Sequence, residues 1–305
     1  KMGSYCFGID VGGTTVKCGL FQTDGNLVDK WEIPTRTENK GENILPDVAK
    51  AIQDKMAEKG IEKADVEGVG IGIPGPINSK GEAACAVNLY WGFTPVAQIL
   101  HDLTGLKACA GNDANVAALG EAWKGAAAGS DNVIMVTLGT GVGGGIIVDG
   151  KIVAGTHGAG GEIGHVLVVR GEAEKCNCGN HGCLETYCSA NALKVTAGMP
   201  IKDFFNLLHQ TQAPNLIQIW RNYLDHLAFA IRNLNLVIDS PVIISGYLAP
   251  YFLDADMQYL LNKVNEGSLF QMTEDQLLVG NHGQYTPAIG AALYYIKEFL
   301  TPVVS

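Results

Sequence analysis

Residues 5–28, YCFGIDVGGTTVKCGLFQTDGNLV, contain three apolar runs separated by a glycine-threonine turn and an Asp-Gly turn. Residues 133–153, VIMVTLGTGVGGGIIVDGKIV, repeat that order. Apolar runs of this length with β-branched and aromatic residues are typical of strands, and Asp-Gly between two runs favours a hairpin. The two copies lie too far apart for a solenoid repeat. They therefore predict two similar α/β domains, each beginning with three strands joined by two turns.

Segments with helical patterns follow each copy. We expect helices over residues 42–60, 94–105, 112–129, 214–238 and 286–300, and further strands over residues 66–77, 107–111 and 241–246. Gly60 is placed to end the first of these helices, because glycine readily adopts a left-handed conformation. Thr94 and Pro95 are expected as the N-cap and the first residue of the second helix.

The chain has 305 residues, of which 47% are hydrophobic, so it can bury the cores of two moderate domains. We place the boundary after Asn112. Residues 1–112 then form a small N-terminal α/β domain and residues 113–287 a larger one. We expect the last helix, at about residues 288–305, to pack back on the small domain.

The charge and the hydropathy of the chain exclude several classes of protein. The formal net charge is −10, and an acidic surface repels phosphate backbones, so we expect no nucleic-acid partner. No window approaches the roughly 20 apolar residues of a membrane span. The first ten residues, KMGSYCFGID, lack the apolar run of a signal peptide. We therefore expect a soluble, cytoplasmic protein without a membrane partner.

The two glycine turns are candidates for binding phosphate. A Rossmann glycine loop opens a helix, whereas the residues after 139-GTGVGGG-145 are strand-like, and a Walker A motif requires a Gly-Lys-Ser/Thr that does not follow here. A hairpin turn with exposed N–H groups and hydroxyls can form an anion-binding nest. The alternative is a pair of tight hairpins without a ligand. The candidate phosphate-binding residues are Gly12, Gly13, Thr14, Thr15 and Lys17 in the first copy and Thr137, Gly139, Thr140 and Gly141 in the second.

Asp10 ends the first strand of the first copy, where the second copy has Thr137 or Leu138. An aspartate beside a phosphate nest can anchor Mg²⁺, often through water. The alternative is an aspartate that caps the turn.

Asn112 and Asp113 separate a short predicted strand from an alanine-rich helix. A carboxylate at a strand end can accept the proton of a hydroxyl that is being phosphorylated. Asn and Asp are also preferred helix N-caps. On spacing alone, the capping role is favoured over the role of a base.

The stretch 175-KCNCGNHGCLE-185 contains three cysteines, and His165 lies eleven residues before the first of them. Four such ligands suit structural Zn²⁺. A disulfide is disfavoured in a reducing cytosol, and CxC is not the CxxC redox motif. The expected ligands are His165, Cys176, Cys178 and Cys183. His181 and Cys188 are rival ligands, and Cys188 is expected to begin a helix. We expect the other four cysteines, Cys6, Cys18, Cys85 and Cys109, to be buried.

DVGGTT, NDANVAALGE, TLGTGVGGG and the cysteine cluster together resemble the ROK family of sugar kinases within the actin/hexokinase-like superfamily. Within the family, the chain most resembles the bacterial glucokinases. The resemblance carries ordered motifs over residues 5–190 and is weaker over 191–300. It implies two actin/hexokinase-like (ribonuclease H-like) α/β domains around a cleft. ATP would sit between the two glycine turns, with a turn at Gly246 on the adenine side, and the hexose would lie deep in the cleft.

The resemblance also assigns roles to individual residues. Asp113 matches the catalytic base and Asn112 a residue that binds sugar hydroxyls. Glu162, His165 and Glu185 match residues that contact the hexose. The pattern CxCGxxGCxE is matched in full, which supports Zn²⁺, and one ring nitrogen of His165 would bind the metal while the other faces the sugar.

Two positions depart from the family pattern. Many relatives carry Glu where this chain has Gly111, and relatives have more glycines where it has Tyr247. The resemblance further implies ATP and Mg²⁺ as cofactors and a homodimer or homotetramer.

The predicted function is that of an ATP-dependent hexose kinase, with ATP and D-glucose giving ADP and D-glucose 6-phosphate. The alternative is a kinase for another hexose, namely N-acetylmannosamine, allose or fructose, and Glu162 argues against the first of these. A sugar-responsive ROK repressor is a remote alternative, because it requires a basic helix-turn-helix, whereas this chain is acidic and its first glycine turn begins at Gly12.

Overall fold

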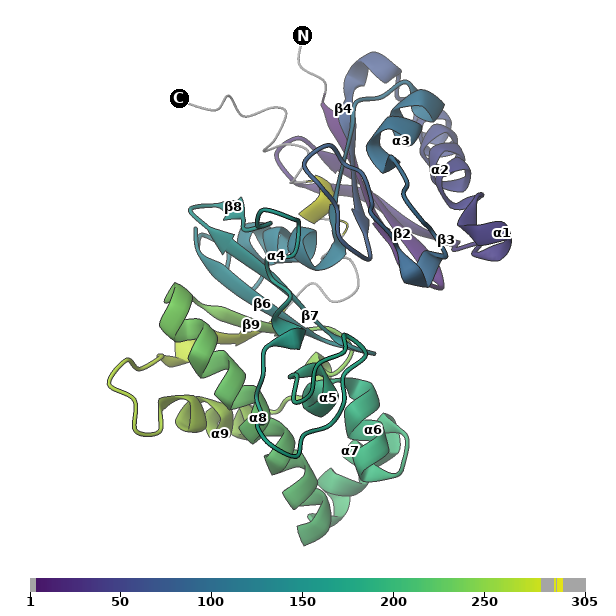
Figure 1. Ribbon diagram of the computed structural model, residues 1–305. Coiled ribbons are helices and arrows are strands. Elements are labelled where there is room, and N and C mark those ends of the chain that lie inside the picture. The colour runs from purple at the N-terminus through teal and green to yellow at the C-terminus, as the bar shows by residue number, and fades with distance from the viewer. Residues whose placement is uncertain (1–3, 281–287, 289, 293–305) are drawn as a thin grey trace. The chain divides into compact units, whose positions relative to one another are not determined.

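The computed structural model describes residues 4–280, 288 and 290–292 (Figure 1). Within these residues, two five-stranded sheets form the framework, and the first has the order β3-β2-β1-β4-β5. Its strands are β1 (Tyr5–Val11), β2 (Thr15–Gln22), β3 (Leu27–Pro34), β4 (Val66–Ile73) and β5 (Ala108–Asn112). β1, β2 and β3 pair antiparallel, whereas β4 and β5 extend the sheet parallel to β1.

The second sheet repeats this plan in the order β8-β7-β6-β9-β10. Its strands are β6 (Val133–Leu138), β7 (Val142–Val148), β8 (Lys151–Ile152), β9 (Val242–Ser245) and β10 (Leu277–Val279). Asp149 and Gly150, in the turn before β8, have φ of 51° and 70°, the positive values that a type I′ hairpin turn requires. The predicted repeat of three strands joined by a glycine turn and an Asp-Gly turn is therefore confirmed.

The helices of the N-terminal half are α1 (Glu38–Gly41), α2 (Ile44–Lys59), α3 (Val96–Thr104) and α4 (Asp113–Lys124), with 3₁₀ turns η1 (Lys63–Asp65) and η2 (Val87–Leu89). Gly60 ends α2 as predicted, with a left-handed φ of 65°. The predicted start of α3 is wrong by one residue: Pro95, not Thr94, is its N-cap. α4 also ends earlier than predicted, and Gly125 follows it.

The later helices are α5 (Glu185–Cys188), α6 (Ala190–Ala197), α7 (Ile201–Thr211), α8 (Pro214–Ile238) and α9 (Asp254–Asn265), with 3₁₀ turns η3 (Ile163–His165), η4 (Ala249–Tyr251) and η5 (Glu274–Gln276). α8 has the predicted bounds. α6, α7, α9 and β10 have no counterpart among the predicted elements. The helix predicted over residues 286–300 lies mostly outside the described residues.

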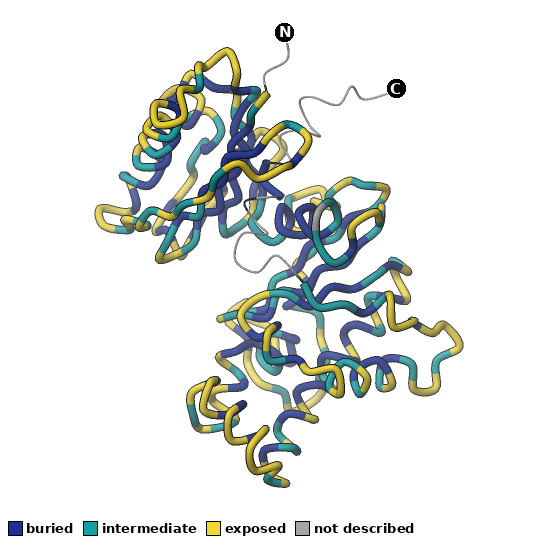
Figure 2. Tube along the Cα trace, turned by 180° about the vertical axis from the view of Figure 1, so that it is seen from behind, coloured by how far each residue is buried: buried dark blue, intermediate teal, exposed yellow. Residues whose placement is uncertain are grey.

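The strands of both sheets are largely buried (Figure 2), and their apolar side chains cluster with those of helices from the same half of the chain. In the N-terminal half, Ile9 of β1 and Ile71 of β4 share a fully buried cluster with Ile52 of α2. In the second sheet, Ile244 of β9 lies in a cluster with Phe204 of α7. β1 and β4 are buried along almost their whole length, the pattern of strands whose two faces are both covered.

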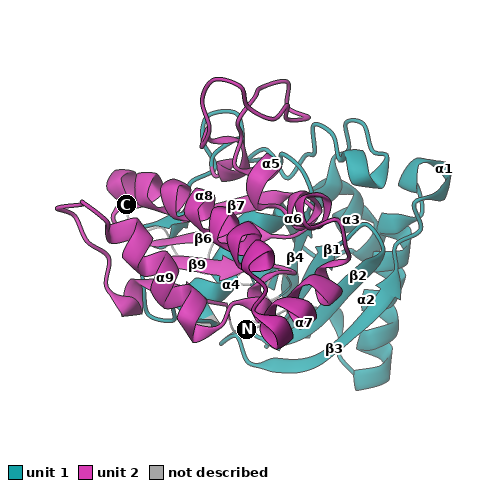
Figure 3. Cartoon of the chain, turned by 90° about the horizontal axis from the view of Figure 1, so that it is seen from below, with its two compact units in different colours: residues 1–131, 147–160, 284–305 teal, residues 132–146, 161–283 magenta. Residues whose placement is uncertain are grey.

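The chain divides into two compact units (Figure 3). The first consists of Lys1–Asp131, Ile147–Gly160 and Gln284–Ser305, and the second of Asn132–Ile146 and Gly161–Gly283. The first unit thus continues past Asn112, where we predict the boundary, and includes α4. It also includes the end of β7 together with β8.

Two glycines of the first sheet seat a helical segment near the C-terminus. Gly8 of β1 and Gly70 of β4 are register partners. A Cβ at Gly8 would collide with the carbonyl oxygen of Ala288, and a Cβ at Gly70 with that of Ala291. Only glycine at both positions lets this segment approach the sheet so closely.

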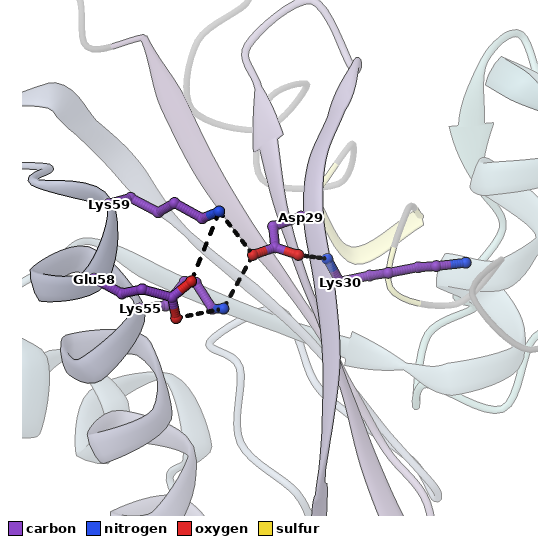
Figure 4. A network of polar contacts seen from close by, with 5 residues as sticks. All are labelled: Asp29, Lys30, Lys55, Glu58 and Lys59. Atoms are coloured by element: carbon purple, nitrogen blue, oxygen red, sulfur yellow. Dashed lines mark hydrogen bonds and ion pairs between the residues drawn. The ribbon is translucent and has the colours of Figure 1, made fainter.

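A charge network joins α2 to β3 (Figure 4). The carboxylate of Asp29 lies 3.0 Å from Nζ of Lys55 and 3.1 Å from Nζ of Lys59. The two ammonium groups lower the pKa of Asp29 to about 2. Lys55 also lies 4.6 Å from the ring centroid of Trp31. These contacts fix α2 against the edge strand β3.

The cysteines outside the cluster lie largely as expected. Cys6, Cys18 and Cys109 are buried, but Cys85 is exposed, so the prediction was wrong for that residue. Cys85 lies in an irregular segment between β4 and α3, where no sheet face covers it. In the part of the chain that the structure describes, no helix has the length and hydropathy needed to span a membrane.

Candidate functional site

The four predicted zinc ligands lie together in the second unit. Sγ of Cys178 is 3.6 Å from Sγ of Cys183, and Sγ of Cys176 is 3.6 Å from Nδ1 of His165. All four ligand atoms lie within 4.8 Å of one another. A tetrahedral zinc ion with bonds of about 2.3 Å to sulfur and about 2.0 Å to nitrogen would space its ligand atoms by roughly 3.5–3.8 Å. The residues therefore fit the metal.

Neither rival ligand belongs to the cluster of four found among the described residues. Sγ of Cys188 contacts the backbone oxygen of Tyr223 at 3.5 Å and is buried in the core. Cys188 ends α5 instead of beginning a helix, so that prediction was wrong. His181 is exposed and does not belong to the cluster found among the described residues.

Backbone geometry shapes the loop that carries the cysteines. The N–H of Cys176 donates to the oxygen of Asn180 at 2.8 Å, and the N–H of Gly179 donates to the oxygen of Cys176 at 3.0 Å. Gly179 and Gly182 have φ of 95° and 87°, values that favour glycine. The Gly/Asn-rich sequence therefore closes a tight turn that brings the three sulfur atoms to one side.

His165 has one ring nitrogen toward the cysteines and the other toward Glu162. Nδ1 faces Cys176, and Nε2 lies 4.0 Å from Oε2 of Glu162. The side chains of His165 and Glu162 are 35% and 51% exposed, so both can reach a ligand. A metal on Nδ1 would leave the proton on Nε2, which makes that nitrogen a hydrogen-bond donor.

Glu185 is the first residue of α5, directly after the cysteine loop. Its Oε2 accepts a hydrogen bond from the backbone N–H of Val142 at 2.9 Å. Val142 is the first residue of β7 and follows the second glycine turn. The structure thus places Glu185 against that turn as well as beside the zinc ligands.

The first glycine turn is a compact loop between β1 and β2. The N–H of Gly12 donates to the oxygen of Thr15 at 3.0 Å, and Oγ1 of Thr35 donates to the oxygen of Gly12 at 2.7 Å. Gly13 has no positive φ, and a Cβ there would meet nothing within 4 Å. No local packing requires a glycine at this position, so the open space above it suits the approach of a ligand. Thr35 belongs to no recognisable motif, and it supports the turn from 23 residues away.

The second turn is also closed by a backbone hydrogen bond, but over two residues instead of three. The N–H of Gly139 donates to the oxygen of Gly141 at 3.0 Å, and the N–H of Ala190 donates to the oxygen of Gly139 at 2.7 Å. A Cβ at Gly139 would again meet nothing within 4 Å. Thr140 is exposed beside it, and Thr137 lies partly exposed near the end of β6. This turn therefore presents the predicted phosphate-binding residues on an accessible loop.

Gly246 lies next to the second turn. Its φ is 89°, and a Cβ there would come within 2.8 Å of the backbone nitrogen of Leu138, the last residue of β6. The N–H of Leu248 donates to the oxygen of Leu138 at 3.0 Å. Tyr247 is 55% exposed beside it.

Asp10 and Asp113 lie at the same end of the first sheet, where β1 and β5 end. Asp10 pairs with Gly72, which pairs with Gly111 at the end of β5, and Asp113 begins α4 two residues later. Burial, and after it the charge of Asp113, raise the pKa of Asp10 to about 7, although Lys17 on β2 opposes the shift. A buried carboxyl group with such a pKa is suited to a divalent cation, because the cation favours its charged form.

Asn112, not Asp113, is the N-cap of α4. Its Oδ1 accepts from the N–H of Asn115 at 3.2 Å, and its Nδ2 donates to the oxygen of Gly75 at 3.0 Å. Oδ1 of Asp113 accepts from the N–H of Ala114 at 2.8 Å. The capping role thus falls on Asn112, and the carboxylate of Asp113 sits in the first turn of the helix.

The ROK family model matches residues 6–298 of the chain. The glucokinase of Halalkalibacterium halodurans is 46% identical over 187 residues, which cover 61% of this chain and 57% of that protein. The chain thus matches little more than half the length of this relative.

Solved structures of the same family resemble the whole chain. The ROK hexokinase from Thermus thermophilus has a TM-score of 0.84 and 28% identity, over 96% of this chain and 98% of that one. A ROK family glucokinase from Streptomyces griseus, in complex with glucose and AMPPNP, has a TM-score of 0.73 and 27% identity, over 95% of this chain and 98% of that one.

Proposed function

The chain belongs to the ROK family, and we propose that it is an ATP-dependent hexose kinase of the glucokinase type. The reaction would convert ATP and D-glucose to ADP and D-glucose 6-phosphate. The observation that carries the proposal is the placement of two carboxyl groups at one end of the first sheet, Asp10 near the end of β1 and Asp113 directly after β5. The charge of Asp113 contributes to the raised pKa of the buried Asp10. Phosphoryl transfer to a hydroxyl needs a carboxylate for the proton and a site for Mg²⁺.

In the first unit, Asp113 would accept the proton of the sugar 6-hydroxyl. Asp10 would hold Mg²⁺, directly or through water, and the ion would neutralise charge on the transferred phosphate. The accessible N–H groups and hydroxyls of the first turn, from Gly12 to Thr15, together with Lys17, would bind phosphate oxygens. Asn112 would add one sugar contact, using the hydrogen-bonding capacity that its capping bonds leave over.

In the second unit, Glu162, His165 and Glu185 would bind hexose hydroxyls. Zinc would fix the imidazole of His165 so that Nε2–H is a defined donor, with Glu162 beside it as an acceptor. A matched set of donors and acceptors discriminates strongly among sugars, because a wrong hydroxyl leaves a polar group unpaired. The second turn, from Thr137 to Gly141, would bind phosphate, and Gly246 would flank the adenine.

Glucose is proposed as the sugar because two of the three named relatives are glucokinases. A homodimer or homotetramer is the proposed assembly, and sedimentation equilibrium would measure it.

The test is ADP release across glucose, mannose, fructose, allose, N-acetylglucosamine and N-acetylmannosamine. A kcat/KM for glucose that exceeds all others by at least about tenfold, or 1.4 kcal/mol in transition-state binding, would support the glucokinase assignment. A preference for another sugar would keep the kinase and change its substrate. Absence of ADP release with every sugar, in protein that retains zinc and a folded circular dichroism spectrum, would refute the proposed function.

A further inference from the structure

A carboxylate of the hexose-binding set lies against the second glycine turn. Oε2 of Glu185 accepts from the N–H of Val142 at 2.9 Å. A Cβ at Gly141 would lie 2.5 Å from that same oxygen, so a side chain at position 141 would push the carboxylate out. The glycine at 141 therefore makes room for Glu185.

A second segment packs on the start of β7. A Cβ at Gly164 would collide with the backbone oxygen of Val142, and one at Gly144 would collide with the side chain of Ile163. Both close approaches involve η3, which ends at His165. β7 is thus contacted by η3 and by the first residue of α5.

The zinc ligands connect these two segments. His165 ends η3, and Cys183 lies two residues before Glu185. Cys183 pairs with Leu167 in an isolated bridge, and the N–H of Leu184 donates to the oxygen of Val166 at 2.9 Å. A metal bound by His165 and Cys183 would hold the two segments together at the point where both touch β7.

We infer that the cysteine loop, residues 175–185, positions the second glycine turn, residues 139–141. Glu185 is the positioning residue, because its hydrogen bond with the N–H of Val142 holds the end of that turn in place. The inference rests on the proposed function and extends it, since it gives the zinc site a role in nucleotide binding as well as in hexose binding. Loss of zinc or of the Glu185 acceptor then weakens nucleotide affinity even when no sugar is present.

The experiment measures two quantities on the full chain. Calorimetry gives the Kd for MgADP without sugar, and hydrogen exchange gives the rate at residues 139–142 without any ligand. The proteins compared are wild type, Glu185→Ala, Glu185→Gln, Glu172→Ala and zinc-depleted wild type. Glu172 is the control, because it is an exposed glutamate of the same loop.

Glu185→Ala should raise the Kd for MgADP by about tenfold and speed exchange at residues 139–142 by about tenfold, because a hydrogen bond to a charged acceptor is lost. Zinc depletion should do the same. Glu185→Gln keeps a carbonyl oxygen that can accept from Val142, so it should keep the Kd within about threefold of wild type while the KM for hexose rises. Glu172→Ala should match wild type, and the three variants should retain zinc.

The inference would be overturned if neither Glu185→Ala nor zinc depletion changed the hydrogen-exchange rate at residues 139–142 or the Kd for MgADP. That outcome would count against it whether or not the chain is a kinase. Faster exchange with unchanged MgADP affinity would overturn the nucleotide role. A wild-type protein that binds no MgADP would refute the proposed function and the nucleotide role together. Exchange would still show in that case whether zinc and Glu185 order the turn.

Discussion

Asp10 and Asp113 lie at one edge of the first sheet, and the charge of Asp113 adds to the burial that raises the pKa of Asp10 to about 7. The same carboxyl group has a pKa of about 3.8 when it is solvated. Between these two values the folded state holds a proton that the unfolded state has released. Stability from this group is therefore greatest below about pH 4 and falls as the pH rises toward 7.

Asp10→Asn should remove this penalty. At pH 8 and without Mg²⁺, the variant should gain as much as about 4 kcal/mol in free energy of unfolding, from about three pKa units at 1.36 kcal/mol each. The gain should shrink as the pH falls and vanish near pH 4. Urea unfolding at four pH values measures it, and Asp24→Asn in an exposed turn is the control. A gain that does not depend on pH would contradict the raised pKa of Asp10.

The same pKa predicts how activity depends on pH. Mg²⁺ must displace the proton of Asp10, so kcat/KM at low Mg²⁺ should rise as the pH increases through about 7. Raising the Mg²⁺ concentration should move the midpoint to lower pH, because the ion favours the charged carboxylate. If the pH midpoint of kcat/KM does not change with the Mg²⁺ concentration, Asp10 does not bind the metal.

Cys178→Ala should leave less than one zinc per chain after dialysis against a chelator, because three ligands hold the ion far less tightly than four. The exposed Cys85 offers the matched control, and Cys85→Ala should retain full zinc. Atomic absorption on the two purified variants makes the comparison. Equal metal content would exclude Cys178 as a ligand.

Gly70→Ala should lower the free energy of unfolding by about 1–3 kcal/mol or more, because the new methyl group would collide with the backbone of Ala291. Gly92→Ala is the control, since a Cβ there meets nothing within 4 Å and its φ is not left-handed. Its effect should stay within about 0.5 kcal/mol. Comparable losses in the two variants, measured by urea unfolding, would show that Ala291 does not pack on this sheet.

The strand repeat is predictable from the sequence because its signals are local. The first two apolar runs of each copy end at a glycine turn and at Asp-Gly, and the turn residues impose the hairpins. β10 carries no such signal. It has three residues, Leu277–Val279, and becomes a strand only through parallel pairing with β9. A pattern of alternation cannot be recognised over so short a segment.

The zinc ligands were predictable for the same reason, since three of the four lie within eight residues. The bond from Val142 to Glu185 was not, because it joins residues 43 positions apart. The hydrogen bond from Thr35 to the oxygen of Gly12 was equally unpredictable, because these residues are 23 positions apart. Spacing in a sequence identifies a ligand set that is local, whereas the partners that orient it depend on how distant segments pack.

Asp113→Asn should reduce kcat by at least about a hundredfold, because the amide cannot accept the proton of the sugar hydroxyl. Glucose affinity, measured by calorimetry, should change by less than about threefold, since the amide keeps the shape and one acceptor of the carboxylate. Asp254→Asn is the matched control: Asp254 is also the first residue of a helix, but it is exposed on α9. It should retain wild-type kcat. If Asp113→Asn retains turnover, Asp113 is not the base. If glucose affinity falls as much as kcat does, Asp113 mainly binds the sugar.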